Sequence, residues 1–418
     1  MREMKDSGAA WIGEIPEEWE ISLINTLYTV RNTKVSDVDY QPLSVTMKGI
    51  VPQLSTAAKT NAHDDRKLVK KGDFAINSRS DRRGSCGISD YDGSVSLINT
   101  VLSPRNEMNP IYYSWLFHSS EFADEFYRWG HGIVDDLWTT RWQEMRNISI
   151  PVPPLSIQHQ IATYLDQKCT QIDALITNQQ KQIEKLKAYK QSLITETVTK
   201  GLNPDVPMKD SGVEWIGEIP EGWEIAATKY LFNIETGATP KSDNHSFFDG
   251  EVVWVTPADF KTDDIFVSFG KKNLTIEGLN SCSATLVPKG SLIFSKRAPI
   301  GSVVISSVEL CTNQGCLSCI PYTSNLTKYY YYVMSICTEQ YNLLGSGTTF
   351  KEISASNFMN FSLPLPTISE QQAIVSYLDQ KCTQIDKLIS IKQQKIEKLQ
   401  QYKKSVIYEY VTGKKEVK

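Results

Sequence analysis

The sequence predicts an α+β protein in which two mixed α/β domains are joined by two long helices forming an antiparallel coiled coil. The whole is a pseudo-two-fold tandem repeat. Three observations lead to this prediction. The chain contains two pairs of internal repeats, and the segments between these repeats have diverged. Both copies of the longer repeat carry a heptad pattern. The length of 418 residues is enough for two to four domains.

The first pair of repeats is short. Residues 4–21 and 208–225 share 15 of 18 positions at an offset of 204, through the common pattern Asp-Ser-Gly-x-x-Trp-Ile-Gly-Glu-Ile-Pro-x-x-Trp. Each copy introduces a new unit of the chain, so we expect two tandem copies of one fold.

The second pair is longer and predicts the coiled coil. Residues 158–198 and 371–411 share 25 of 41 positions at an offset of 213, and both follow a proline-rich turn. Apolar side chains recur at steps of seven, with one polar interruption in each copy. The predicted seam residues are Leu165, Ile172, Gln179, Leu186 and Leu193 in the first copy, and Leu378, Ile385, Lys392, Leu399 and Val406 in the second. Because each stripe needs a partner, pairing the two helices with each other buries both.

The segments between the frames match only in patches. Residues 22–146 and 226–359 share fragments such as Lys70-Lys71-Gly72 with Pro288-Lys289-Gly290, and Arg79 falls opposite Arg297. Short β-rich runs such as 252–255 and 292–294 alternate with Gly, Pro and Asp, and helices are expected at 111–128 and 327–343. We therefore predict two similar folds whose surfaces have diverged.

The charge is unevenly distributed along the chain. The net charge of −4 and pI near 5.9 argue on average against a nucleic-acid partner. Each short repeat alone carries −4, however, whereas the two variable segments are close to neutral and the predicted helices are basic. The net negative charge therefore comes from the short repeats. Local basic clusters in the variable segments remain available for phosphate contacts.

The sequence lacks the motifs of several common catalytic and nucleotide-binding sites. There is no phosphate-binding Gly-x-x-x-x-Gly-Lys loop, no Asn-Pro-Pro-Tyr or Asp-Pro-Pro-Tyr, no His-Glu-x-x-His and no Gly-x-Ser-x-Gly. Cys311, Cys316 and Cys319 cluster without a convincing fourth ligand, so we interpret them as buried thiols rather than a zinc site. No metal site and no catalytic residues are predicted. The absence of a long apolar run or signal segment and the sparse cysteines favour a cytoplasmic protein without a membrane partner.

Together, the paired frames resemble the specificity (S) subunit of type I restriction-modification systems. The pattern Gln-x-x-Ile-x-x-Tyr-Leu-Asp-x-Lys before each Ile-Glu-Lys-Leu-x-x-Tyr-Lys helix carries this resemblance with the short repeats. The second variable segment adds three runs that are also similar to the family: 236–240, 253–257 and 346–350.

The resemblance implies a sequence-specific DNA-binding subunit that is not itself an enzyme. It directs methylation and restriction at an asymmetric, bipartite target in double-stranded DNA. It implies two methyltransferase (M) subunits and restriction motor (R) subunits as partners, with S-adenosylmethionine, ATP and Mg²⁺ held by those partners. The implied domains are a first target recognition domain at 1–155, a helix at 156–200, a linker at 201–207, a second target recognition domain at 208–368 and a helix at 369–414.

The expected DNA contacts are basic and hydroxyl side chains of the variable segments. For base contacts these are Arg79, Arg82, Arg83, Lys296 and Arg297, then Thr46, Lys48, Thr256 and Lys261, with Lys71 and Lys289 added from the basic clusters. The matched Arg79 and Arg297 favour a shared role in positioning phosphates. Replacing Arg297 by Ala is expected to weaken DNA binding and flatten its salt dependence.

Three alternatives remain open. One is the specificity subunit of a fused restriction-methylation enzyme of the type IIB or IIG kind, which uses the same two-domain logic. Another is a coiled-coil adaptor that bridges proteins without reading DNA, and a third is an enzyme acting alone.

Overall fold

In the computed structural model, the described residues are 2–53, 64–79, 83–132, 138–260, 264–346 and 351–417. They form two compact units. The first comprises Met1–Lys181 with Lys392–Lys418, and the second comprises Gln182–Ile391. Each unit holds one short repeat, one variable segment and part of each long helix. The units therefore differ from the sequence repeats, because both long helices are divided between them.

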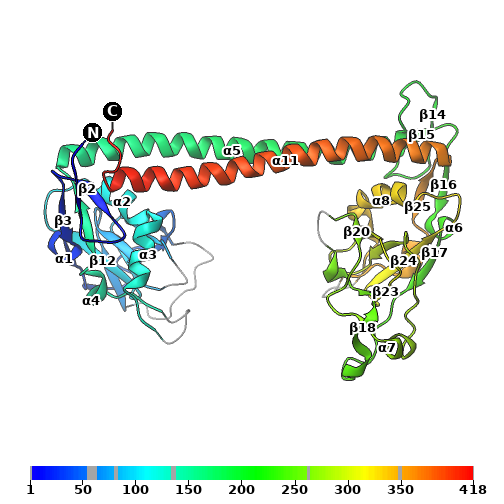
Figure 1. Ribbon diagram of the computed structural model, residues 1–418, viewed down its shortest axis with the longest axis horizontal. Coiled ribbons are helices and arrows are strands. Elements are labelled where there is room, and N and C mark those ends of the chain that lie inside the picture. The colour runs from blue at the N-terminus through cyan, green and yellow to red at the C-terminus, as the bar shows by residue number, and fades with distance from the viewer. Residues whose placement is uncertain are drawn as a thin grey trace. The chain divides into compact units, whose positions relative to one another are not determined.

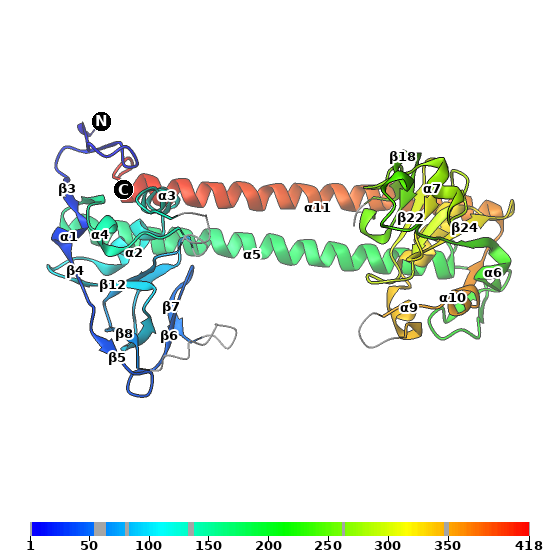
Figure 2. The same cartoon turned by 90° about the horizontal axis from the view of Figure 1, so that it is seen from below.

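The two long helices are α5 (Leu155–Lys200) and α11 (Ile368–Val411). Within each unit, the parts of α5 and α11 that belong to it lie side by side (Figures 1 and 2). In the first unit Tyr164 packs against Tyr410 with ring centroids 4.4 Å apart, and Asp173 pairs with Lys403 at 2.7 Å. Because the numbers rise on one helix and fall on the other, the pairing is antiparallel.

The predicted seam residues differ in burial. Leu165, Ile172 and Val406 are buried in the first unit, as Leu378 and Ile385 are in the second. Gln179, the polar interruption, is buried with 7% of its surface exposed. Leu186, Leu193, Lys392 and Leu399 are partly exposed.

The first unit is built on a four-stranded sheet in the order β10-β9-β12-β4, with a three-stranded sheet β11-β8-β5 beside it. Its strands are β1 (Met4–Asp6), β2 (Glu14–Pro16), β3 (Glu20–Leu23), β4 (Tyr28–Val30), β5 (Lys34–Val35), β6 (Leu43–Thr46), β7 (Gly49–Pro52), β8 (Arg66–Val69), β9 (Phe74–Asn77), β10 (Cys86–Ile88), β11 (Gly93–Ser96), β12 (Asn99–Pro104) and β13 (Ser149–Val152). Its shorter helices are α1 (Ile24–Leu27), α2 (Pro110–His118), α3 (Ser120–Arg128) and α4 (Trp142–Met145).

The second unit is built on a five-stranded sheet in the order β17-β24-β21-β22-β20. Its strands are β14 (Met208–Asp210), β15 (Glu218–Pro220), β16 (Glu224–Ala227), β17 (Phe232–Thr236), β18 (Phe248–Val252), β19 (Trp254–Val255), β20 (Phe266–Val267), β21 (Leu292–Ser295), β22 (Val303–Ser306), β23 (Cys311–Thr312), β24 (Cys316–Pro321) and β25 (Ser362–Leu365). Its helices are α6 (Thr228–Leu231), η3 (His245–Phe247), η4 (Pro257–Asp259), α7 (Ile276–Asn280), α8 (Thr327–Ser335), α9 (Thr338–Leu344) and α10 (Ala355–Met359).

The two units share one plan, as the repeats predict. The order β10-β9-β12-β4 in the first corresponds to β22-β21-β24-β17 in the second, and every neighbouring pair in both is antiparallel. The expected helices at 111–128 and 327–343 each form two helices instead of one. In the first unit Ser119 ends α2 with ψ of 145° and caps α3, so the chain cannot stay helical there.

The repeated residues hold the same places in both units. Gln158 is buried and accepts a hydrogen bond from the backbone N–H of Asn109, while its amide donates to the Pro153 carbonyl. Gln371 makes the same two contacts, with the N–H of Leu326 and the carbonyl of Pro366. Each glutamine therefore ties a proline-rich turn to the start of α2 or α8, which explains why both copies keep it.

The ends of the long helices are packed into the variable domains. The buried hydroxyl of Tyr112 donates to the carbonyl of Val411 at 2.8 Å, and that of Tyr329 donates to Val198 at 2.9 Å. Trp19 and Trp223 of the short repeats are both about 1% exposed and pack in the same two cores. Each short repeat thus packs against the end of a long helix. No helix among the described residues is long and apolar enough to cross a membrane.

Candidate nucleic-acid interface

In the first unit, Arg79 lies just beyond β9, where a second segment approaches it. The Arg79 backbone forms a β-bridge with Thr139, which also pairs with His131 through two hydrogen bonds of 3.0 Å. Strand β10 begins beside this point, since the Asn77 N–H donates to the Ser85 carbonyl. The Arg79 side chain is exposed, and no described acidic side chain forms an ion pair with it. Arg79 thus stands at an exposed junction of three segments.

Arg83 lies at the same end of the sheet on an aromatic support. Its guanidinium is 5.2 Å from the centre of the Tyr127 ring, and it forms an ion pair with Asp124 of α3. Tyr127 in turn stacks on Trp138 at 5.6 Å. The side chain keeps 48% of its surface exposed. Arg83 is therefore oriented and still accessible.

A cavity of about 20 Å³ is lined by both arginines and by the rings of Phe117, Phe122 and Phe126, among other residues. This volume is about that of one water molecule, so the cavity is far too small to receive a nucleobase. Among the described residues, this cavity therefore offers no space for an extruded base.

In the second unit, Lys296 and Arg297 lie at the equivalent end of β21. Both pair with Glu352, through Lys296 Nζ at 2.9 Å and Arg297 Nε at 2.8 Å. Partial burial would raise the pKa of Glu352, but the hydrogen bonds from the two cations outweigh it and lower the pKa below its usual 4.5. Lys296 is only 16% exposed, whereas Arg297 is 45% exposed. Arg297 is the accessible member of this group.

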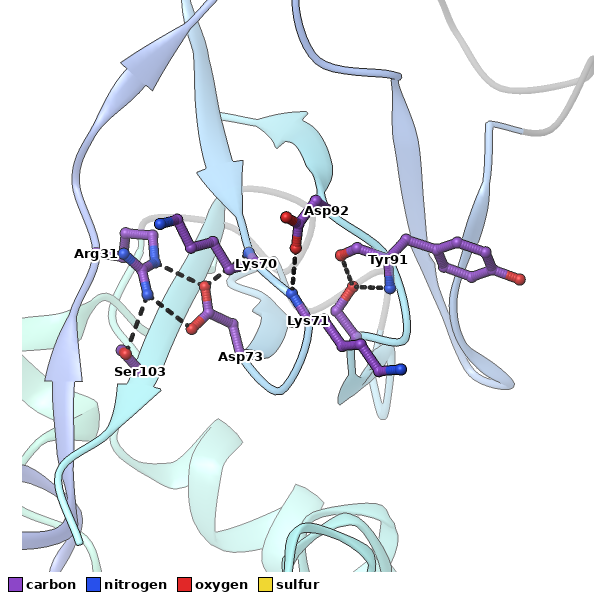
Figure 3. A network of polar contacts seen from close by, with 8 residues as sticks. Arg31, Lys70, Lys71, Asp73, Tyr91, Asp92 and Ser103 are labelled. Carbon is purple, nitrogen blue, oxygen red and sulfur yellow. Dashed lines mark hydrogen bonds and ion pairs between the residues drawn. The ribbon is translucent and has the colours of Figure 1, made fainter.

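Lys71 lies at the opposite end of β9 from Arg79, in a turn that carboxylates hold (Figure 3). Asp73 accepts the N–H of Lys70 at 2.8 Å and binds Arg31 through two hydrogen bonds of 2.6 and 3.0 Å, while Asp92 accepts the N–H of Lys71. The side chain of Lys71 is exposed. Lys289 holds the matching position before β21, beside Gly290, whose φ of 90° corresponds to 88° at Gly72. Both lysines are thus separated from the arginines by the length of a strand.

The other predicted contacts occupy turns or fall outside the described residues. The hydroxyl of Thr46 donates to the Gly49 carbonyl in the β6–β7 turn, and Lys48 is exposed at its tip. Thr256 donates its hydroxyl to Asp259 at 2.7 Å, which closes a capping box. Arg82 and Lys261 lie outside the described residues. The structure therefore groups Arg79 with Arg83, and Lys296 with Arg297, while Lys71 and Lys289 lie at the other end of the strands.

The cysteines are all free thiols. Cys311, Cys316 and Cys319 are buried, and burial raises the pKa of Cys311 to about 12 and the pKa values of the other two further. Within the described ranges, no group of three His, Cys, Asp or Glu side chains is placed to hold a metal ion.

The residues that orient the arginines were not predicted. Glu352 is 55 positions from Arg297, and Asp124 and Tyr127 are more than 40 positions from Arg83. No local pattern connects such distant residues. Only the alignment of Arg79 with Arg297 could point to this end of the strand.

Comparison with known proteins identifies the class. The chain matches the family described as type I restriction modification DNA specificity domain twice, over residues 16–185 and 220–401. It therefore belongs to that family. This membership confirms the predicted fold class with its tandem repeat, and the expectation of a recognition subunit in place of an enzyme.

Individual relatives agree with this assignment. The chain is 26% identical to the putative type I restriction enzyme MjaX specificity subunit of Methanocaldococcus jannaschii, over 97% of this chain and 96% of that protein. It is 24% identical to the EcoR124I/EcoR124II specificity subunit of Escherichia coli, over 68% and 66% of the two chains.

Solved structures show the same fold. A chain from work on complex assembly and conformational transition of the type I R-M system aligns with a TM-score of 0.75, at 17% identity, over 95% of this chain and 98% of that one. The HsdS subunit from Thermoanaerobacter tengcongensis aligns with a TM-score of 0.54 at 18% identity, over 96% and 98%.

Proposed function

We propose that this chain is the DNA-reading subunit of a type I restriction-modification complex and directs methylation and restriction at an asymmetric, bipartite target. One observation carries the proposal. Two units with the same strand order present an exposed arginine, Arg79 or Arg297, at the same strand end, within segments whose sequences have diverged. Two related but different readers imply two different half-sites with an unread spacer between them.

The long helices provide the spacing. A helix of 46 residues is roughly 70 Å long at 1.5 Å per residue, which suffices to separate two domains by one DNA turn of about 34–36 Å. Linking two readers raises the affinity of the pair only when their spacing matches the site. Under this proposal the length of the helices selects the spacer length.

Two methyltransferase subunits are the proposed partners of the helices, and repeated exposed apolar residues support them. Leu175 and Leu388 are equivalent positions and are 47% and 48% exposed, and the equivalent Tyr189 and Tyr402 are 56% and 46% exposed. An apolar residue kept at an exposed position in both copies favours two identical binding surfaces. Two copies of one partner fit this arrangement.

The catalytic chemistry is proposed to belong to the partners. S-adenosylmethionine would bind to the methyltransferase subunits, whose usual target in this family is adenine N6, and ATP and Mg²⁺ to the restriction motor subunits. The free thiols fit the reducing cytoplasm, where we place the complex. The acidic short repeats predict weak DNA affinity for the isolated chain, because partner subunits would supply much of the phosphate contact.

A binding selection tests this function. The chain is combined with its methyltransferase, and the complex selects duplexes from a randomised DNA pool. We expect two short, different motifs separated by a fixed spacer. Selection without any sequence preference would support the coiled-coil adaptor and overturn the proposal.

The fused restriction-methylation enzyme predicts the same selection result, so a second observation is needed. A separate gene for a motor-nuclease beside the methyltransferase gene favours the type I assignment. Methyl transfer by the purified single chain would instead revive an enzyme acting alone.

A further inference from the structure

The two matched arginines differ in one respect. Thr139 forms the backbone bridge with Arg79, and the corresponding bridge to Arg297 is formed by Glu352. The second unit therefore has a carboxylate beside its arginine where the first unit has a short neutral hydroxyl. This difference bears on what each arginine can recognise.

The backbone around Glu352 is fixed on both sides. Glu352 and Ser346 exchange two hydrogen bonds of 2.9 Å, and the N–H of Ile353 donates to the Lys296 carbonyl at 3.0 Å. On the facing segment, the hydroxyl of Ser295 donates to the Arg297 carbonyl at 2.8 Å. Both the carboxylate and the guanidinium thus project from ordered backbone, so their ion pair has a defined direction.

The hydrogen bond to Glu352 uses only one edge of the guanidinium. Arg297 donates through Nε, and its two terminal nitrogens make no hydrogen bond to any residue in the described part of the chain. Arg31 is a useful contrast, because it donates to Asp73 through both Nε and Nη2 and to Ser103 through Nη2. The Arg31 guanidinium is therefore used in contacts within the fold, whereas the two terminal nitrogens of Arg297 are available to donate to a ligand.

An arginine held in this way suits a guanine better than a phosphate. The O6 and N7 atoms of guanine form a pair of acceptors in the major groove, and an end-on guanidinium donates to both. Phosphate binding needs only positive charge nearby, and a neighbouring carboxylate weakens it. Because the side chain is already oriented, less conformational entropy is lost when the base is bound.

The neighbouring surface also carries polar groups suited to bases. The Lys296 N–H donates to the Gly315 carbonyl, which brings the segment before β24 next to the arginine. In this segment Gln314 is exposed and accepts a hydrogen bond from the Thr239 hydroxyl. The arginine thus belongs to a polar surface that has more than one possible base contact.

We propose that Arg297 reads a single guanine in the half-site of the second unit, and that Glu352 is the positioning residue that aims its terminal nitrogens. Arg79, without an equivalent carboxylate, is assigned to phosphate. The inference rests on the proposed DNA-reading function and adds to it the identity of one base and of the residue that selects it.

The test compares variants of the full chain in complex with its methyltransferase by selection from a randomised DNA pool. The Arg297→Lys variant keeps the charge but loses the fork. It is expected to lose preference for guanine at one position by about 5- to 150-fold, the equivalent of 1–3 kcal/mol for one bidentate contact. Its preferences at all other positions, including the whole other half-site, and its salt dependence should remain, which also shows that the variant is folded.

The Glu352→Gln variant tests the positioning role. It is expected to weaken the preference at that same guanine, and to raise the affinity for unrelated duplex DNA because a negative charge beside the phosphates is lost. The matched control is Arg79→Lys, which should leave every base preference unchanged. In addition, 7-deazaguanine at the assigned position removes the N7 acceptor, so it should weaken binding by the wild type and have little effect on Arg297→Lys.

The outcomes separate this inference from the function on which it rests. If the wild type selects no motif, the DNA-reading function itself is wrong. If the wild type selects a bipartite motif and Arg297→Lys retains every preference, the reading function stands and the assignment of Arg297 is wrong. If Arg297→Lys loses the guanine and Glu352→Gln keeps it fully, Glu352 has no positioning role.

Discussion

At the scale of single residues, the hydroxyl of Tyr112 stabilises the end of α11. It donates to the carbonyl of Val411, the last residue of that helix, whose oxygen has no partner within the helix. Replacing Tyr112 by Phe should lower the free energy of unfolding by about 1–3 kcal/mol, because a buried acceptor loses its donor. Thermal or urea unfolding of the full chain measures this loss.

The neighbouring Tyr113 provides the matched control. Its hydroxyl is buried and has no hydrogen-bond partner among the described residues. Tyr113→Phe should therefore leave stability unchanged or slightly raised. Equal losses in both variants would contradict the role given to the Tyr112 hydroxyl.

A second residue-scale prediction concerns Glu125, whose side chain is 8% exposed. Burial would raise its pKa, but hydrogen bonds from Arg128 and Trp129 outweigh that effect and lower the pKa below its usual 4.5. A lowered pKa stabilises the folded state above the unfolded value, and this contribution is lost as the pH falls through the folded value. The free energy of unfolding, measured in urea between pH 7 and pH 3, should fall less steeply with decreasing pH for Glu125→Gln than for the wild type. Equal slopes for the two proteins would contradict this role of Glu125.

Equivalent site residues of the two units could be predicted from the sequence only where the repeats align. The offset that pairs Lys71 with Lys289 also pairs Arg79 with Arg297, and the structure puts each pair at equivalent strand ends. The contrast between Thr139 and Glu352 was not predictable, because it depends on two β-bridges between segments that are 60 and 55 residues apart. Long-range pairing of this kind has no signature in a single sequence.

At the scale of elements, one ion pair occurs twice along the helices. Lys403 pairs with Asp173 at 2.7 Å in the first unit, and the equivalent Lys190 pairs with Asp386 at 2.7 Å in the second. Each is partly exposed, so a double-mutant cycle with alanine should give a coupling of about 0.2–1 kcal/mol that decreases with salt. A coupling above about 2 kcal/mol would show that these pairs stabilise the fold far more than partly exposed ion pairs usually do.

The helices also allow a test of spacing. Inserting one heptad within residues 176–190 of α5, with a matching insertion in α11, adds about 10 Å and keeps the seam in phase. The spacer of the DNA target should change while both half-site sequences remain. Methylation mapping of cells that carry the variant measures this, and altered half-sites would rule out a spacing role.

The long helices were more predictable than the domains. A heptad pattern is local and repeats many times, so it predicted both helices, and six of the ten predicted seam residues are buried. The sheets depend on strands that are far apart in the sequence, such as β4 and β12, which no local pattern pairs. The break between α2 and α3 did have a local signal, because Ser119 caps the second helix.

At the scale of the whole molecule, the charge of −4 fits a reader that works within a complex. Each short repeat carries a net charge of −4 and packs around the end of a long helix, where Trp19 or Trp223 is buried. The strand ends with Arg79, Arg83 and Arg297 are cationic, although Asp124 and Glu352 balance part of that charge. We expect this partial balance to limit binding to unrelated DNA.

The most direct test of the central claim is methylome sequencing of cells that carry this chain together with its methyltransferase. The two related but diverged units predict one asymmetric motif, with two different short half-sites separated by an unread spacer of fixed length. A palindromic or continuous motif, or no methylation that depends on this chain, would contradict it.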